Sequence, residues 1–292
     1  MKGYKAFEKG LICKGKQYAE NTVFEEDEAT VCKKGMHFCK NLFDVLDYYP
    51  LVDDKGEFSD FAEVEALDEP VTDDNKKFCS KKLKIGAKLS FSEFVEAMAS
   101  FECEKINETK VKTTEKDNAQ IGSSGDDAKI GSSGDNAKIG SSGNYAQIGS
   151  SGYAAKIGSS GDAAQIGSSG NYAQIGSSGD DAKIGSSGYA AKIGSSGNYA
   201  QIGSSGNYAQ IGSSGDDAKI KSEGKYSVIC CAGNGSIAKG KVGSWITLSE
   251  WKFDKNEGCY IPVCVKTEKI DGVKIKADTF YVLENGEFVE VK

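Results

Sequence analysis

The chain has 292 residues, with 36 basic and 43 acidic residues and a formal net charge of −7. All 36 basic residues are lysine, so the chain lacks the guanidinium forks that usually recognise phosphates. We therefore expect no direct binding to nucleic acid. The sequence shows no long apolar run and no export pattern, which favours a cytoplasmic protein that enters no membrane.

Residues 1–112 have ordinary globular composition and predict an α+β N-terminal domain. A first helix is expected between a cap at Asn41 and a stop at Pro50. A second is expected behind the Ser90 and Glu93 capping box, with an apolar stripe of Phe91, Phe94, Val95, Met98 and Phe101. Strands are expected at Lys5–Phe7, Thr30–Val31, Met36–Cys39, Phe61–Leu67 and Phe78–Ile85.

A dense acidic cluster lies in the first domain and is made of Glu20, Glu25, Glu26, Asp27 and Glu28. Such a cluster is usually a solvated loop. The functional alternative is a surface that docks a basic partner, for example a nucleic-acid-binding protein.

Chemistry is most plausible around the only histidine, His37. With Cys13, Cys32 and Cys39 it has the residue types of a Cys₃His zinc site, although the spacing is not that of a zinc knuckle. Isolated cysteines are more often small buried apolar residues, and without an export signal we expect the nine cysteines to be reduced. A nucleophilic pair of His37 and Cys39 is the remaining alternative. We expect no other cofactor and assign no catalytic residue.

A nine-residue unit, Ala-(Lys/Gln)-Ile-Gly-Ser-Ser-Gly-x-x, runs eleven times without a gap from Ala119 to Asp217. A fixed short period is typical of a solenoid. We expect a mainly β protein with a parallel β-solenoid (a β-roll) over residues 113–235, with two units and eighteen residues per coil and six coils in the repeats. Alanine and isoleucine would point inward along a strand, and Gly-Ser-Ser-Gly would form the turn.

The rod is close to neutral, with 11 acidic residues and 9 lysines over residues 113–235. That balance disfavours DNA mimicry by the rod itself. The variable pair matches a calcium-binding repeat or a flat ice-binding face poorly. A structural spacer is the simplest interpretation.

Residues 236–292 predict a small β domain with hairpin turns at Asp271-Gly272 and Asn285-Gly286. An open solenoid end is a bare sheet edge. We expect Trp245, helped by Tyr226, to cover it.

Several motifs resemble those of an uncharacterised family of phage and prophage proteins. They are Lys2-Gly3-Tyr4, Gly35-Met-His-Phe-Cys39, Asp44-Val-Leu-x-Tyr-Tyr-Pro50, Gly243-Ser-Trp-Ile-Thr-Leu248 and the terminal Val289-Glu-Val291. Members of that family join such ends through a variable run of short repeats. The resemblance implies a phage context and no assigned activity.

We therefore expect a non-enzymatic binding protein that acts in the host cytoplasm. Its partner would be a host protein with a basic nucleic-acid-binding surface, as for an anti-defence (anti-CRISPR-like) inhibitor, with the solenoid as a rigid scaffold and self-association open. One alternative is a virion, tail or adhesin-type structural protein, since β-solenoids suit fibres. The other is a small enzyme centred on His37 and Cys39.

Overall fold

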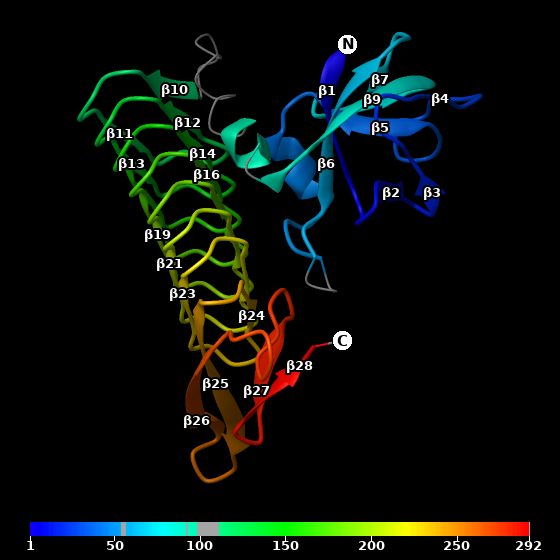
Figure 1. Cartoon of the computed structure of the whole chain (residues 1–292). Coiled ribbons are helices and arrows are strands. Elements are labelled where there is room, and N and C mark those ends of the chain that lie inside the picture. The colour runs from blue at the N-terminus through cyan, green and yellow to red at the C-terminus, as the bar shows by residue number, and fades with distance from the viewer. Residues whose placement is uncertain (54–56, 92, 98–110, 292) are drawn as a thin grey trace.

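The computed structural model describes residues 1–53, 57–91, 93–97 and 111–291. It is mainly β: an N-terminal sheet domain lies beside a parallel β-solenoid, and antiparallel hairpins close the C-terminal end (Figure 1). No helix in these described ranges has the length and apolarity needed to cross a membrane.

The N-terminal domain is built on an antiparallel seven-stranded sheet. In spatial order its strands are β4 (Val23–Glu25), β9 (Lys82–Leu89), β6 (Asp60–Ala66), β1 (Lys2–Phe7), β5 (Met36–Cys39), β8 (Lys77–Ser80) and β7 (Val71–Thr72). A small ribbon of β2 (Ile12–Cys13) and β3 (Lys16–Gln17) lies apart from it.

The expected strands of this domain are largely found. The strand Met36–Cys39 has the bounds predicted, but Phe78–Ile85 is divided between β8 and β9 by the turn around Lys81. Thr30 makes only an isolated bridge to Lys34.

The helical expectations need one correction. The first helix is a short 3₁₀ helix, η1 (Phe43–Asp47), whose Phe43 amide donates to the Asn41 side-chain oxygen at 3.0 Å. The capping box is confirmed, with the Ser90 amide 2.7 Å from Glu93 Oε2 and the Glu93 amide 3.2 Å from Ser90 Oγ. Phe91, Phe94 and Val95 are buried, while Met98 and Phe101 lie outside the described residues.

The solenoid consists of two parallel sheets in which each strand pairs with the one eighteen residues on, except that β23 (Val228–Cys231) pairs with β25 (Trp245–Asp254) at an offset of seventeen. The prediction of two units per coil is therefore confirmed. We call the two sheets the covered sheet and the open sheet, from what lies on their outer faces. Parallel pairing in the covered sheet runs through β10 (Val111–Thr114), β12 (Lys129–Ser132), β14 (Gln147–Ser150), β16 (Gln165–Ser168), β18 (Lys183–Ser186), β20 (Gln201–Ser204), β22 (Lys219–Ser222) and β24 (Ile237–Lys239). In the open sheet it runs through β11 (Gln120–Ser123), β13 (Lys138–Ser141), β15 (Lys156–Ser159), β17 (Gln174–Ser177), β19 (Lys192–Ser195), β21 (Gln210–Ser213), β23 (Val228–Cys231) and β25 (Trp245–Asp254).

Eight parallel strands in each sheet make about eight coils, two more than the six expected from the repeats. The additional strands come from residues before and after the regular units. Sequences as different from the repeat as Val228–Cys231 keep its register because isoleucine and another apolar residue still occupy the inward positions.

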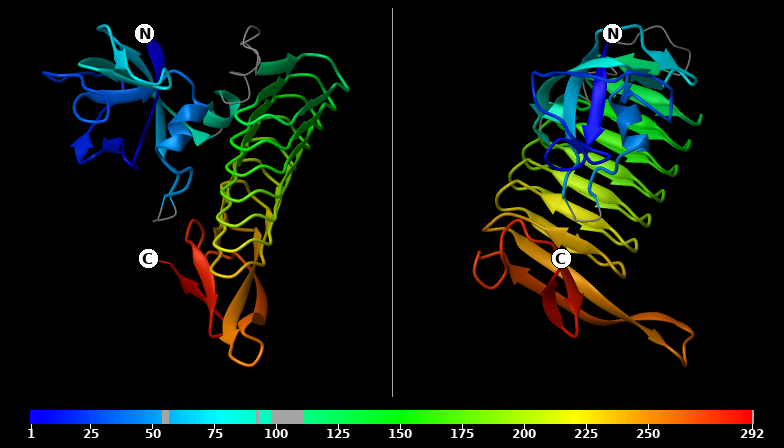
Figure 2. Two further views of the ribbon diagram at one scale, coloured as in Figure 1. Left: turned by 180° about the vertical axis from the view of Figure 1, so that it is seen from behind. Right: turned by 90° about the vertical axis from the view of Figure 1, so that its right-hand side faces the viewer.

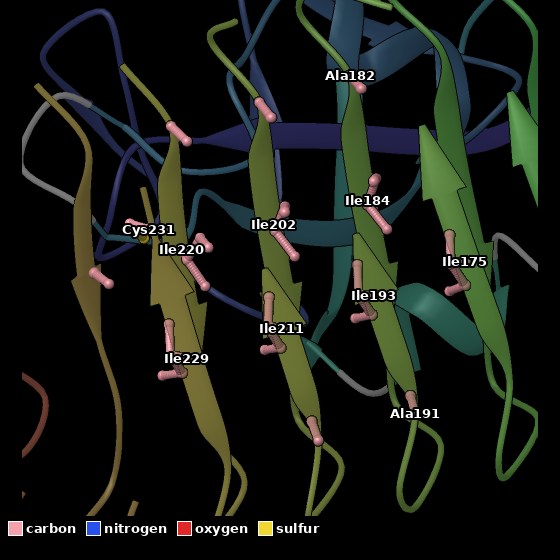
Figure 3. Packing of buried hydrophobic residues seen from close by; sticks show 14 of the residues in the cluster. Ile175, Ala182, Ile184, Ala191, Ile193, Ile202, Ile211, Ile220, Ile229 and Cys231 are labelled. Carbon is pink, nitrogen blue, oxygen red and sulfur yellow. The ribbon is translucent and has the colours of Figure 1, made fainter. Parts of the chain in front are cut away.

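The phase of the strand within the unit differs from the prediction. The strand is (Lys/Gln)-Ile-Gly-Ser, and only the second serine, the second glycine and the variable pair form the turn. Isoleucine and the first serine point inward and the preceding alanine is buried, so rows such as Ile184 and Ile193 from opposite sheets meet inside the rod (Figure 3). Ten inward serine hydroxyls, from Ser132 to Ser213, have no hydrogen-bond partner within the described residues.

The variable pair forms side-chain rows along both edges of the rod. On one edge the first variable residue accepts the backbone N–H of its counterpart in the next coil at 2.7–3.0 Å, from Asp126 through Asp216. On the other edge five exposed tyrosines have ring centroids 5.3–5.6 Å apart; they are Tyr153, Tyr172, Tyr189, Tyr208 and Tyr226. We call this row the tyrosine ladder.

The C-terminal end is closed by two hairpins. Strand β25 turns back into β26 (Cys259–Lys269), and β27 (Tyr281–Glu284) turns into β28 (Glu287–Glu290) through the predicted Asn285-Gly286 turn, both residues having positive φ. Asp271-Gly272 instead lies in a loop, where Asp271 Oδ1 accepts three backbone N–H groups.

The solenoid end is not covered by the residues expected. Trp245 is 46% exposed and Tyr226 is 55% exposed, as the last ring of the tyrosine ladder. Ile270, Ile275 and Leu283 from the C-terminal segment close the apolar interior instead.

Candidate functional site: a lysine-lined pocket in the N-terminal domain

A cavity of about 540 Å³ opens beside β1 and β5 in the N-terminal domain. Its wall combines six lysines and four tyrosines with a single acidic residue, Glu26. The lysines are Lys5, Lys14, Lys16, Lys33, Lys34 and Lys77, and the tyrosines are Tyr4, Tyr18, Tyr48 and Tyr49. This pocket is strongly cationic, although the chain as a whole has a net negative charge.

Lys5 lines this pocket and is only 5% exposed. Its Nζ donates to the backbone oxygen of His37 at 2.8 Å and lies 5.3 Å from the centre of the Phe7 ring. Burial lowers the pKa of Lys5, and the neighbouring Cys13 thiol opposes that shift. An ammonium with three N–H donors in so little solvent is most stable when an anion also accepts from it.

Two further lysines of the pocket also lie over aromatic rings. Lys77 Nζ is 4.3 Å from the centre of the Tyr48 ring, and Lys16 Nζ is 5.5 Å from that of Tyr18. Aromatic faces attract cations and hold their positions without neutralising them. The arrangement presents positive charge and flat apolar surface together.

His37 contributes a neutral imidazole. Burial first, and then the charges of Lys5, Lys77 and Lys14, lower its pKa to about 4. Its Nε2 accepts the Cys32 backbone N–H at 2.9 Å, which assigns the ring proton to Nδ1. The imidazole fixes the Cys32 loop against β5.

The four residues predicted to bind zinc do line this one pocket, but they make other contacts. Cys13 Sγ accepts from the Tyr49 hydroxyl at 3.1 Å, and His37 Nε2 is occupied by the Cys32 amide. Across the described ranges no group of three or more His, Cys, Asp or Glu side chains is placed to hold a metal ion.

The same contacts bear on the nucleophilic pair. Burial raises the pKa of the Cys39 thiol to about 12, so it stays protonated, and the His37 nitrogen that could accept its proton is already bonded. This geometry does not produce the activated thiolate that the enzyme alternative needs.

The acidic cluster lies at the exposed edge of the domain, and most of its members face lysines. Glu25 Oε1 is 2.6 Å from Lys82 Nζ, Glu28 Oε2 is 3.1 Å from Lys34 Nζ, and Glu26 pairs with Lys16. Glu20 Oε2 accepts the Lys88 amide at 3.0 Å, and Asp27 is exposed. These ion pairs reduce the negative electrostatic potential of the cluster. Its role as a docking surface for a basic partner stays a prediction.

Residues 1–97 match the model of a family described as a domain of unknown function (DUF7666). The match contains the whole pocket and stops before the solenoid. Comparison with curated proteins gives no match, and comparison with solved structures gives none either.

In the sequence, the cysteines and His37 indicate this region, and its lysines are not recognised as part of a site. The available signal was Lys5, which stands inside a predicted strand where its neighbours Ala6 and Phe7 are apolar and buried. Lys77 and Tyr49 carry no such signal, since only the pairing of β5 with β8 and the position of η1 bring them to the pocket.

Proposed function

We propose that the protein works by binding, and that its N-terminal domain takes a small anionic ligand with a flat ring, of the nucleoside phosphate class. The buried ammonium of Lys5 carries this proposal, because it lines a pocket rich in lysine and tyrosine. Lysine is a point-charge binder of phosphate, and tyrosine faces stack on planar rings.

The dimensions and charge of the pocket support this class of ligand. A volume of about 540 Å³ lies within the usual range for small-molecule sites. Ion pairs with Glu26 and Glu28 engage Lys16 and Lys34. The other four lysines of the pocket form no ion pair with a described residue, which leaves them to meet an anion. A β-solenoid is typically a structural or binding architecture, and here it would act as the scaffold that carries the pocket.

The phage context, the anti-defence role and a host partner with a basic surface remain proposals that rest on the resemblance and the net charge. They are compatible with a ligand pocket, because the solenoid and its ends leave other surfaces for a protein partner.

The test is calorimetric titration of the full chain with ATP, with adenosine and with inorganic phosphate. We expect ATP to bind, and adenosine to bind much more weakly because it lacks the anion. Lys5→Met removes one charge-assisted hydrogen bond and should weaken ATP at least about tenfold, given roughly 1.5–3 kcal/mol for such a bond.

Lys77→Met replaces a half-buried lysine at the start of β8, which is less buried than Lys5, and thermal unfolding checks that this variant folds. Lys156→Met on the solenoid is the matched control. ATP binding that is unchanged in both pocket variants, or no stronger than adenosine binding, would overturn the proposal.

A further inference from the structure

The two outer faces of the solenoid carry the same residues but are covered differently. In the regular repeat strands of both sheets the outward positions are lysine or glutamine and then glycine. Lys221 in β22 and Cys230 in β23 replace the glycine. The N-terminal domain lies against the covered sheet, on the side away from the open sheet (Figures 1 and 2). The contacts on the covered face therefore show which chemical groups can pack against this pattern of residues.

On the covered face the glycines receive aromatic rings. Phe58 and Phe91 stack with centroids 4.1 Å apart, and a methyl group added at Gly203 would come within 2.5 Å of one ring and 2.9 Å of the other. Only glycine lets the rings approach the strand so closely.

The lysine and glutamine row of the covered face makes polar contacts with the N-terminal domain. Gln147 Oε1 and Gln201 Oε1 accept N–H groups at 3.2 and 3.1 Å, and other members of the row donate to acidic and carbonyl oxygens. Lys183 Nζ donates to the Leu46 carbonyl at 2.5 Å, and Gln165 Nε2 donates to Asp47 Oδ1 at 3.1 Å. Lys221, which stands at the glycine position of β22, lies 3.8 Å from the centre of the Phe58 ring and 3.6 Å from Glu57 Oε2. The chemistry that fits this face is thus an aromatic pair flanked by oxygen acceptors.

The open face has the same elements without these contacts. Its six glycines, from Gly122 to Gly212, have no atom of another residue within 4 Å of an added methyl group. Its lysines Lys138, Lys156 and Lys192 form no ion pair with any described residue. The isoleucines beneath it remain 3–4% exposed, whereas those beneath the covered face are fully buried. A continuous shallow groove runs along these strands.

The chain itself carries a matching group at its C-terminal hairpin. Phe253 and Tyr260 are 55% and 56% exposed and meet edge to face with centroids 5.5 Å apart. Phe253 is the only exposed phenylalanine in the described part of the chain. Asp254 ends β25, where its Oδ1 accepts the backbone N–H groups of Asn256 and Glu257, and Glu257 lies in the turn that follows.

We propose that this hairpin tip of one copy docks in the open-face groove of a second copy. Its rings would lie on the glycine row, and its carboxylates would meet the lysines of the row beside it. Strands β25 and β26 continue the open sheet and project beyond the last coil, so the tip points away from its own groove (Figure 1). The contact joins two different surfaces, and it links copies head to side.

The test is sedimentation of the full chain over a range of concentrations. We expect reversible self-association, weakened at least tenfold by Phe253→Ala with Tyr260→Ala. Gly158→Leu, Gly176→Leu and Gly194→Leu together should weaken it as much, because they fill the middle of the groove. The matched control, Ser151→Leu, adds the same side chain to an exposed turn off the groove and should leave association unchanged.

A second measurement reports which surfaces meet. Cys259 is exposed at the hairpin tip. Cys32 and Cys230 are exposed as well, so the background for this test carries Cys32→Ser, Cys103→Ser and Cys230→Ser. In that background with Gly176→Cys, a short bismaleimide should join the new thiol of one copy to Cys259 of another, and Cys259→Ser should abolish the linked dimer. A chain that stays monomeric, association that survives either set of variants, or linkage that persists without Cys259 would overturn the proposal.

Discussion

The ring of Phe91 lies so close to Gly203 that a methyl group on that glycine would be 2.5 Å from the ring's Cζ atom. Gly203 lies in a strand and has no positive φ, so its backbone conformation does not require glycine. Glycine is required there because the N-terminal domain packs its rings against this position. The row of glycines therefore determines where aromatic rings can pack against the outer face of the solenoid.

Gly203→Ala should loosen the N-terminal domain from the rod. The added methyl group displaces two stacked rings, and overpacking of this kind costs about 1–3 kcal/mol. The measurement is thermal unfolding combined with limited proteolysis of the N-terminal domain. Gly176→Ala, on the open face with nothing within 4 Å, is the control and should change neither. Equal sensitivity of the two variants would contradict the assignment of the covered face.

Ser186→Ala should leave the protein as stable as before or stabilise it by up to about 1 kcal/mol. Its hydroxyl is fully buried and has no hydrogen-bond partner among the described residues, so removing it ends a desolvation cost. Ser222→Ala is the contrast, because Ser222 Oγ donates to Ser227 Oγ at 3.0 Å. It should cost about 0.5–1.5 kcal/mol. Chemical denaturation measures both, and a larger loss at Ser186 would show that its hydroxyl is satisfied after all.

Tyr172→Ala should destabilise the solenoid more than Tyr199→Ala does. Tyr172 contacts a ring on either side in the tyrosine ladder, at 5.3 and 5.6 Å, while Tyr199 stands on the opposite edge. Aromatic pairs contribute roughly 0.5–1.5 kcal/mol each, and partial exposure places these at the lower end. We expect a difference of about 1 kcal/mol in the free energy of unfolding. Indistinguishable variants would mean that the ladder contributes nothing to stability.

The N-terminal domain should lose stability as the pH falls from about 6.5 to 4. His37 has its pKa lowered in the folded state, so its neutral form stabilises the fold above the unfolded pKa, and protonation removes that stability. The contribution is about 1–2 kcal/mol once the partial exposure of the ring is allowed for.

His37→Gln keeps a hydrogen-bond acceptor for the Cys32 amide but does not titrate. The difference in unfolding free energy between the two proteins, followed from pH 7 to 4, isolates the histidine from the carboxylates. A difference that stays constant over this range would contradict the lowered pKa.

The coil was predictable from sequence because its period is local: two nine-residue units per coil place Ile184 eighteen residues from Ile202, which is their observed register. The residues at which each strand begins and ends were not predictable, because Gly-Ser can form part of a turn or, with the serine pointing inward, part of a strand. Pairing Lys5 with Tyr18 and Lys77 in one pocket needs contacts far apart in the chain, which no local pattern encodes. Nor could a sequence that repeats identically on both sheets say which face would be covered.

The eighteen-residue register also imposes a rule of parity on the length of the chain. Inserting or deleting two units moves the two ends closer or farther along the rod by one strand spacing, about 4.8 Å, and leaves every face as it was. Inserting or deleting a single unit would move the C-terminal hairpins to the opposite sheet relative to the N-terminal domain. Copies of this rod that differ in repeat number should therefore differ by even numbers of units if their two ends are to keep the same relation.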